Sequence, residues 1–382
     1  MGVSNLKVLF LSIDDPTSRK SWSGTPYYIL KSILPHFKST TIAVPFNKLI
    51  KLYPPKIKSK LKYLVTGKRF DYGHSKELAM IYKEHFEQQI QNSDADLVIA
   101  VAASTAMAYI ETEKPFVHIS DATFAKMINY NPDYTSLTQK SISEGNEIEY
   151  LALSKSLINV FSSEWARASA IEDYNITADK NYCIPFGANL DEDPHVDWSA
   201  KCINDKINLL FLGVKWASKG GDIALDTYIY LKEKNIPVTL YVCGCKVPYY
   251  MKDPDVINIP FLNKNNPVEY RKLIEILNST HFLLLPTKAE CYGIVFCEAS
   301  AFGIPSLTYA TGGVPSAVYH HVNGILLQPN ATHVEYADQI LYYVNHPKEY
   351  LQLCKTARRK YEQQLNWRRW AQSFIEILKK YF

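Results

Sequence analysis

Short apolar runs recur along the chain, and each is followed by a loop of proline, glycine or polar residues. Apolar runs of this kind, bounded by turn residues, predict buried strands. The predicted strands are residues 6–13, 41–45, 97–102, 115–119, 157–162, 182–185, 207–212, 238–243, 256–259, 282–285 and 306–309. Helical spacing of apolar residues between several of these strands predicts an α/β protein with parallel sheets.

Helix signals lie between these strands. The predicted helices are residues 27–34, 75–90, one starting at 164, 223–231, 268–277, 294–302, 337–343, 350–361 and 367–382. Thr25 is expected to cap the first helix, with Pro26 at its start, and Ser163 the helix that begins at Glu164. The strand–helix alternation restarts near residue 207, which predicts a second domain.

One strand–loop–helix–strand unit, residues 282–309, holds the strongest candidate chemistry. Pro286 ends its first strand, Glu290 lies in the loop, and Gly293 lets the backbone turn into a helix of small residues. The loop therefore joins the carboxyl end of a strand to a helix N-terminus, which is where ligands bind in open α/β sheets. Free N–H groups at that N-terminus favour an anion such as phosphate.

Two carboxylates, Glu290 and Glu298, flank this helix start with seven residues between them. On one continuous helix they would be separated by about 12 Å. Paired carboxylates of glycoside hydrolases are only about 5–9.5 Å apart. We therefore do not expect an acid/base pair on one bond; the two side chains can instead hold different parts of one extended ligand, with phosphates between them.

A second loop with a cation precedes a helix in the C-terminal half. Lys219 is followed by Gly220 and Gly221, directly before the helix face that begins at Ile223. A cation, free N–H groups and flexible backbone together suit a diphosphate. Taken alone, a Lys-Gly-Gly sequence is usually only a turn.

The N-terminal half offers weaker candidates at strand ends. Gly24 would let the backbone approach a ligand closely, although the local sequence alone favours an ordinary strand–helix turn at Gly24 and Thr25. His118 and Asp121 flank the carboxyl end of the strand at 115–119. A lone strand histidine is more often structural, whereas an aspartate just after a parallel strand is more suggestive of a ligand site.

Composition limits the class of protein. The chain has 382 residues, of which 47% are hydrophobic and 21% charged, enough for two domains. No apolar run approaches the roughly 18 residues of a membrane span, and the N-terminus does not resemble a signal peptide. Seven scattered cysteines indicate reduced thiols and a cytoplasmic protein, and Cys243-Gly-Cys245 is too tight for a usual zinc pair.

Basic residues are concentrated in residues 47–70, which contain no acidic residue. The eight basic residues are Lys48, Lys51, Lys56, Lys58, Lys60, Lys62, Lys68 and Arg69. Since the net charge is +4, the rest of the chain sums to +4 − 8 = −4. A solvated helix and a peripheral contact with an anionic membrane through residues 48–69 both explain this segment. We expect no nucleic-acid partner, because no known motif accompanies the basic run.

The ordered motifs of the C-terminal half resemble the donor-binding signature of the retaining, GT-B-fold glycosyltransferases of family 4 (glycosyltransferase group 1). The matching positions are Glu290, Gly293, Glu298, 303–305 (Gly-Ile-Pro), 311–313 (Thr-Gly-Gly) and 323–325 (Asn-Gly-Ile). The spacing of the two glutamates alone is a weak signal, whereas the ordered set across about forty residues is strong.

The resemblance implies an α/β protein of the GT-B fold, with two Rossmann-like domains that face each other across a cleft. We expect an N-terminal acceptor-side domain at 1–190, a C-terminal nucleotide-sugar domain at 191–365, and a C-terminal helix at 366–382 that crosses back to the N-terminal domain. The implied reaction moves a sugar from a nucleotide-diphosphate sugar to an acceptor hydroxyl with retention of configuration. Neither a cofactor nor an essential metal is implied.

The resemblance also assigns roles on the donor side. Glu290 would hold the sugar or support an oxocarbenium-like transition state, Glu298 would hydrogen-bond the ribose, and Lys219 would neutralise the leaving diphosphate. An arginine of the family pattern falls on Val214, so the neighbouring Lys215 is the expected substitute. Helix amides near Gly293 and Ile294 would contact phosphate, and Phe261 and Leu262 lie where relatives contact the base.

On the acceptor side, the resemblance places the loop with Gly24 and Thr25 near donor phosphate and acceptor. Asp121 or His118 would orient donor or acceptor, although Ser120-Asp121 stands where a His-Asp pair is expected and His118 comes two residues early. Two other classes stay open. One is a sugar-nucleotide epimerase on the same scaffold, and the other is a non-catalytic protein that binds a sugar nucleotide or a membrane.

Overall fold

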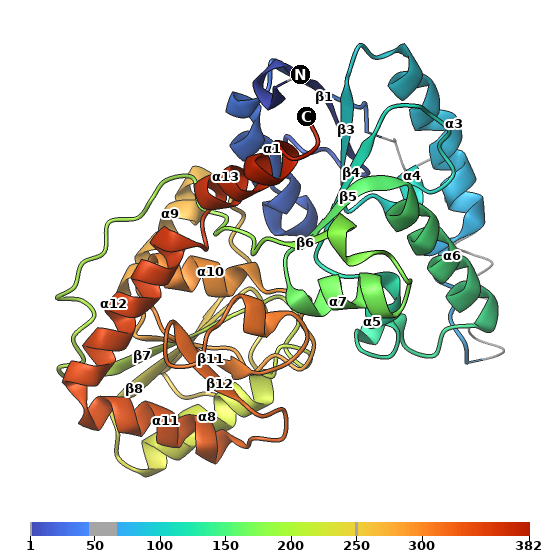
Figure 1. The fold of residues 1–382 in the computed structure, drawn as a ribbon. Coiled ribbons are helices and arrows are strands. Elements are labelled where there is room, and N and C mark those ends of the chain that lie inside the picture. Colours follow the sequence, from blue (N-terminus) through green and yellow to red (C-terminus); the bar gives the residue numbers. More distant parts are fainter. Residues whose placement is uncertain (1, 46–66, 249–250) are drawn as a thin grey trace. The chain divides into compact units, whose positions relative to one another are not determined.

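The computed structural model describes residues 2–45, 67–248 and 251–382 (Figure 1). Contacts divide the chain into two compact units, one formed by Met1–Ile184 with Ala371–Phe382 and the other by Pro185–Trp370. The chain enters the second unit after Ile184, whereas the sequence placed this boundary at 190. It returns to the first unit within the last helix, α13 (Trp367–Leu378).

The first unit is built on a six-stranded, all-parallel sheet with the order β2-β1-β3-β4-β5-β6. Its strands are β1 (Lys7–Ser12), β2 (Ser39–Ile42), β3 (Leu97–Val101), β4 (Phe116–Ser120), β5 (Ser156–Phe161) and β6 (Asn181–Cys183). Its longer helices are α1 (Thr25–Ile33), α3 (Lys76–Asn92), α6 (Gln139–Lys155) and α7 (Glu164–Glu172), with short helices α4 (Ser104–Met107) and α5 (Phe124–Met127). The parallel sheet that the apolar runs predict is confirmed.

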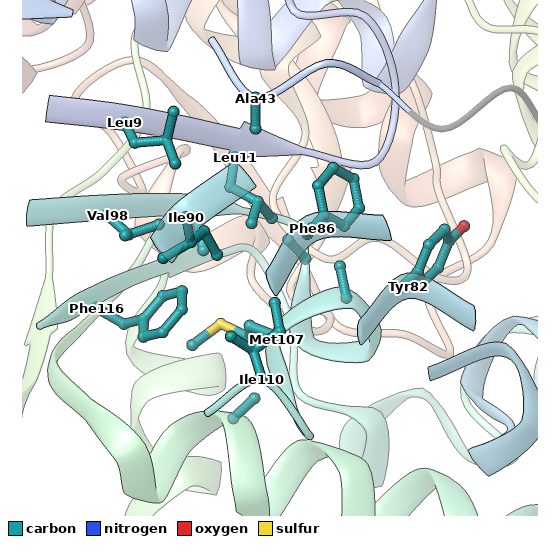
Figure 2. Packing of buried hydrophobic residues seen from close by; sticks show 14 of the residues in the cluster. Leu9, Leu11, Ala43, Tyr82, Phe86, Ile90, Val98, Met107, Ile110 and Phe116 are labelled. Atoms are coloured by element: carbon teal, nitrogen blue, oxygen red, sulfur yellow. The ribbon is translucent and has the colours of Figure 1, made fainter. Parts of the chain in front are cut away.

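The core of the first unit forms where α3 packs on the sheet. Figure 2 shows Phe86 and Ile90 of α3 close to side chains of β1 and β3, among them Leu11 and Val98. All four are buried. Burying side chains of this size contributes about 1.5–3 kcal/mol each, which fixes the sheet whose strand ends carry the candidate residues.

Two local predictions for this unit were wrong. Thr25 does not cap α1: it is the first helical residue, and Gly24 precedes it in a left-handed conformation with φ 88° and no side-chain capping bond. Helix α6 was missed, because Gly145 and the buried polar residues Ser141 and Glu149 interrupt its apolar periodicity. Gly145 packs against Phe124, where an added Cβ would lie 2.3 Å from the ring.

The second unit repeats the architecture with the strand order β12-β11-β10-β7-β8-β9, again all parallel. Its strands are β7 (Ile207–Leu212), β8 (Val238–Cys243), β9 (Val256–Ile259), β10 (Phe282–Leu284), β11 (Ser306–Tyr309) and β12 (Gly324–Leu327). Its helices are α8 (Gly221–Glu233), α9 (Pro267–Ser279), α10 (Ile294–Ala301), α11 (His333–Asn345) and α12 (Pro347–Gln363).

Strand order reverses between β7 and β10 in the second unit. From β7 the chain adds β8 and β9 on one side, and β10, β11 and β12 then extend the other side. Ligands of open α/β sheets bind beside such a switch point, at the carboxyl ends of the strands. The loops that follow β7 and β10 are therefore neighbours at the preferred position for a ligand.

Within the described ranges, no helix combines the length and the apolar character needed to cross a membrane. The segment predicted to contact a membrane is residues 48–69, and its residues 48–66 lie outside the described part of the chain. Arg69 is described and forms an isolated bridge with Leu137.

Candidate active site

Lys219 and Glu290 are brought together at the switch point of the second unit. Lys219 lies in the loop after β7, Glu290 lies in the loop after β10, and the Lys219 ammonium forms an ion pair with Glu290 Oε2. The two side chains are 21% and 17% exposed, so the pair is screened from bulk water but within reach of a ligand. These residues lie 71 positions apart, and the sheet order alone makes them neighbours.

Gly220 lets these two loops approach each other. Its φ of +74° is left-handed, and an added Cβ would lie 2.0 Å from the backbone oxygen of Pro286. The backbone N–H of Lys288 donates to Ser218 O at 2.9 Å and joins the same loops. A side chain at position 220 would separate the loops and with them the Lys219–Glu290 pair.

The N-terminus of α10 opens from the same loop. Gly293 is its N-cap with φ 91°, and no side chain caps the helix. An added Cβ at Gly293 would lie 2.5 Å from the Phe296 ring and 3.2 Å from Glu290 Cγ. The first-turn amides of Ile294 and its neighbours therefore begin beside Glu290, and the helix end favours negative charge.

Glu298 lies further along α10 and has a different partner. Its Oε1 forms an ion pair with Lys264, in the loop between β9 and α9; Glu298 is 5% and Lys264 17% exposed. The estimate of about 12 Å between the two glutamates assumed that both lie on one continuous helix. Glu290 precedes α10, so this assumption does not hold. Each carboxylate is held by its own lysine, from a different strand end.

Lys264 was missed by the sequence analysis. It follows the carboxyl end of β9, on the same side of the sheet as the other candidate residues. No sequence motif includes it. A search for cations after every parallel strand would have found it.

The other donor-side predictions lie in the same unit with varied exposure. Val214, at the position of the absent arginine, is 60% exposed, and Lys215 beside it is also exposed. Phe261 is 63% exposed and Leu262 is buried. Both follow β9, in the loop that also carries Lys264.

In the first unit, His118 is fully buried in the middle of the sheet. Its Nε2 lies 3.1 Å from Ser104 Oγ, and its ring contacts Phe161. Burial lowers the pKa of His118 to about 4, so the imidazole is neutral at pH 7. Its Nδ1 has no hydrogen-bond partner among the described residues. These surroundings favour the structural interpretation of this histidine.

Asp121 occupies a more accessible position just after β4. It is half-buried, and its Oδ2 accepts a hydrogen bond from Trp22 Nε1 at 3.0 Å. Trp22 lies in the loop after β1, so this bond joins two strand-end loops of one sheet. Trp22 (φ 47°) and Ser23 (φ 56°) are left-handed, as is the following Gly24. Left-handed backbone at a non-glycine residue is strained and often marks a functional position.

A buried carboxylate of the first unit also escaped prediction. Glu149 of α6 is 3% exposed, and its Oε1 has no hydrogen-bond partner in the described ranges. Burial raises the pKa of Glu149 to about 7, while the charge of His74 and a hydrogen bond from Ser104 act against this increase. Ser104 therefore contacts both His118 and Glu149.

Metal-ligand clusters were sought throughout residues 2–45, 67–248 and 251–382. No group of three or more histidine, cysteine, aspartate or glutamate side chains there could hold a metal ion. Positive charge at the candidate site comes from lysine side chains.

The part of the chain that carries these paired charges matches a known family. Residues 199–360 match the model of the family described as glycosyl transferases group 1. The match covers less than half of the chain, so it shows a similarity of this segment to that family. The segment contains both ion pairs, the Gly293 turn and the whole of α10.

Curated relatives match parts of the chain. A D-inositol 3-phosphate glycosyltransferase of Thermobifida fusca is 28% identical over 156 residues, which are 38% of this chain and 36% of the relative. The chain thus spans about a third of the length of this relative, and between 25% and 40% of two others with the same name.

Two solved structures resemble nearly the whole chain. Sucrose-phosphate synthase from Thermosynechococcus elongatus is similar with a TM-score of 0.71 and 14% identity, over 99% of each chain. Anabaena Alr3699/HepE, solved in complex with UDP and glucose, gives a TM-score of 0.64 and 14% identity over 98% of this chain and 100% of its own. These likenesses show the fold, which is GT-B with two Rossmann-like domains, as the sequence predicted.

Proposed function

We propose that this protein is a retaining, metal-independent glycosyltransferase of family 4. It transfers a sugar from a nucleotide-diphosphate sugar to a hydroxyl of a glycan, a lipid-linked glycan or a small molecule. The observation that carries the proposal is the group of charges at the β7–β10 switch point: Lys219 and Glu290 beside the N-terminus of α10. Diphosphate needs this combination of cation and free amides.

On the donor side, each end of the donor has its own partner. Lys219 neutralises the leaving diphosphate together with the amides at Gly293 and Ile294, and Lys215 stands in for the absent arginine. Such preorganised charge stabilises the transition state in place of a metal ion. Glu290 holds the sugar, and Glu298 accepts hydrogen bonds from the ribose. Phe261 and Leu262 lie against the base.

In the first unit, we assign the acceptor side to Asp121 and to the loop with Gly24 and Thr25. Asp121 is chosen over His118 because it is half-buried at a strand end, whereas His118 has no exposed surface. The Trp22 indole holds the Asp121 carboxylate in one orientation. A donor phosphate oxygen takes the acceptor proton, so no strong general base is needed from the protein.

The test uses the full chain with a panel of UDP-, GDP- and ADP-sugars. We expect one donor to raise the melting temperature and to be consumed when a panel of hydroxyl acceptors is present. The α-anomeric donor should give an α-linked product by NMR, at a rate unchanged by EDTA. A β-linked product would contradict retention, and a rate abolished by EDTA would contradict metal independence. Turnover of the sugar nucleotide without any acceptor product would indicate an epimerase.

We also propose a cytoplasmic protein that contacts an anionic membrane through residues 48–69, most of which lie outside the described ranges. Each lysine near such a surface contributes on the order of 1 kcal/mol. Cosedimentation with phosphatidylserine vesicles should fall when Lys56, Lys58, Lys60 and Lys62 are changed to Glu. Unchanged sedimentation of that variant would contradict a membrane contact through residues 48–69.

A further inference from the structure

Lys264 is held on two sides next to a carboxylate of the donor site. Its ammonium contacts Glu298 Oε1 on α10, and it also donates to the backbone oxygen of Asn189 at 3.2 Å. Asn189 is itself fixed, because its Oδ1 accepts from Trp367 Nε1 at 2.9 Å in the same unit. The lysine therefore links Glu298 to the first segment of the second unit.

The backbone that carries Lys264 is also well anchored. Asn266 N donates to Asn263 O at 2.8 Å and closes a turn around the lysine. The Glu269 carboxylate accepts from Asn263 N at 2.6 Å and from Asn266 Nδ2 at 2.8 Å. A lysine usually loses much side-chain entropy when it is held in one place, and this turn reduces the freedom of its backbone before any ligand binds.

Glu298 needs such a partner because it is 5% exposed. A buried carboxylate without a compensating charge is strongly disfavoured. A contact with Oε1 restricts the rotation of the carboxylate, and this narrows the directions in which Oε2 can accept a hydrogen bond. A ribose hydroxyl is recognised by direction as well as charge, since hydrogen bonds weaken steeply when they are poorly aligned.

We infer that Lys264 is a positioning residue, which orients Glu298 for the ribose hydroxyls and thereby lets the site discriminate ribonucleotides from deoxyribonucleotides. This inference rests on the proposed function, which makes Glu298 the ribose ligand. Lys264 acts through Glu298 and need not contact the reacting atoms. Its effect is therefore on nucleotide affinity and KM rather than on kcat.

The test compares UDP, GDP and ADP with their 2′-deoxy and 3′-deoxy forms in calorimetric titrations of the full chain. The wild type should bind one ribonucleoside diphosphate at least about tenfold more tightly than one of its deoxy forms. In Lys264→Met this ratio should fall to near one, with affinity for inorganic pyrophosphate unchanged because Lys219 is intact. Lys264→Arg should restore part of the ratio.

A double-mutant cycle distinguishes a Lys264 that positions Glu298 from a Lys264 that contacts the nucleotide itself. It also keeps the test possible if Lys264→Met alone fails to fold. Glu298→Gln combined with Lys264→Met leaves no unpaired charge, so it should fold where Lys264→Met alone does not. If Lys264 acts through Glu298, the change at 264 has no further effect on the ratio in the Glu298→Gln background. A further loss there would overturn the inference.

Lys206→Met is the matched control, because Lys206 also pairs with a carboxylate of this unit, Asp255, at 2.6 Å. It should leave the ratio unchanged. A ratio retained in Lys264→Met, or absent in the wild type although nucleotides bind, would refute the role of Lys264 alone. If no nucleoside diphosphate binds the wild type, the proposed function fails and the inference fails with it.

Discussion

The two units hold their candidate polar groups in opposite ways. In the second unit, Glu290 and Glu298 are each paired with a lysine; Glu298 is buried, and the other three side chains are 17–21% exposed. In the first unit, His118 is buried and neutral at pH 7, and Asp121 accepts from an uncharged indole. Paired charges suit a charged ligand such as a diphosphate, whereas a single carboxylate held by an indole N–H suits a hydroxyl. This difference supports our proposal that donor and acceptor bind to different units.

The largest expected effect comes from Gly220→Ala, which places a side chain between the loops after β7 and β10 of the second unit. Left-handed strain and the close contact with Pro286 O should together lower the free energy of unfolding by roughly 2–6 kcal/mol. Urea unfolding measures it. Gly213→Ala is the matched control, because Gly213 is not left-handed and the nearest atoms to its Cβ would be side-chain atoms, of Lys219 at 3.2 Å and of Leu285 at 3.9 Å. Equal stability of the two variants would mean that these loops are not tightly joined.

Lys219→Met should reduce kcat about a hundredfold to a thousandfold, because it removes the cation at the leaving diphosphate. Glycosyl-transfer rates at saturating donor measure this effect. Lys232→Met is the control: Lys232 also pairs with a carboxylate, Asp255, at 2.7 Å, but lies outside the candidate site. A kcat within a few fold of the wild type for Lys219→Met would contradict the donor assignment.

The buried groups of the first unit should make stability depend on pH in two opposing ways. The pKa of His118 falls from 6.5 to about 4 through burial. Above pH 6.5 His118 is neutral in both the folded and the unfolded chain, so its titration does not reduce the free energy of unfolding. As the pH falls towards 4, the unfolded chain binds a proton that folded His118 does not, which lowers the free energy of unfolding by about 3 kcal/mol. His118→Gln should remove this acid-side loss in denaturant titrations at each pH.

Glu149 should lower the free energy of unfolding as the pH rises, which is opposite to the effect of His118. Burial raises its pKa from 4.5 to about 7, so below pH 4.5 it is protonated in both states. As the pH rises to 7, the unfolded chain releases a proton that the folded state keeps, and the free energy of unfolding falls by about 3 kcal/mol. Glu149→Gln should therefore be more stable than the wild type at pH 8 and equal to it at pH 4. The same difference at both pH values would mean that Glu149 is ionised when folded.

The smallest effect is expected from Trp22→Phe, which removes the indole N–H that holds Asp121. We expect about a tenfold lower kcat/KM for the acceptor, the order of one hydrogen bond to a charged group. Donor affinity should not change, since donor and acceptor sides are assigned to different units. An equal loss of donor affinity would break the comparison on which that assignment rests.

The sequence predicted most of the strands, and it located the donor-site candidates, for physical reasons. Strands buried on both faces are continuous apolar runs, and the run at 207–212 matches β7 residue for residue. Glu290, Gly293 and Glu298 lie within nine residues, so their spacing is visible in the chain. The Lys219–Glu290 pair then follows from the neighbouring positions of β7 and β10 in the sheet.

Other features depend on contacts between residues far apart in the chain. Lys264 meets Glu298 from 34 positions away, and Trp22 meets Asp121 from 99 positions away. Neither pair has a local pattern. The burial of Glu149 on α6 was hidden for the same reason, because the space it fills is formed by tertiary packing. Local pattern therefore located the strand ends, and packing decided which side chains meet there.

The most direct test of the central claim, that the second unit binds the nucleotide-diphosphate part of a donor, is a calorimetric titration of the full chain with UDP, GDP and ADP. One of them should bind, and at a hundredfold excess over Kd it should raise the free energy of unfolding by about 2.7 kcal/mol. Lys219→Met should abolish most of this stabilisation. Binding of none of the three, or equal stabilisation of wild type and Lys219→Met, would contradict the account.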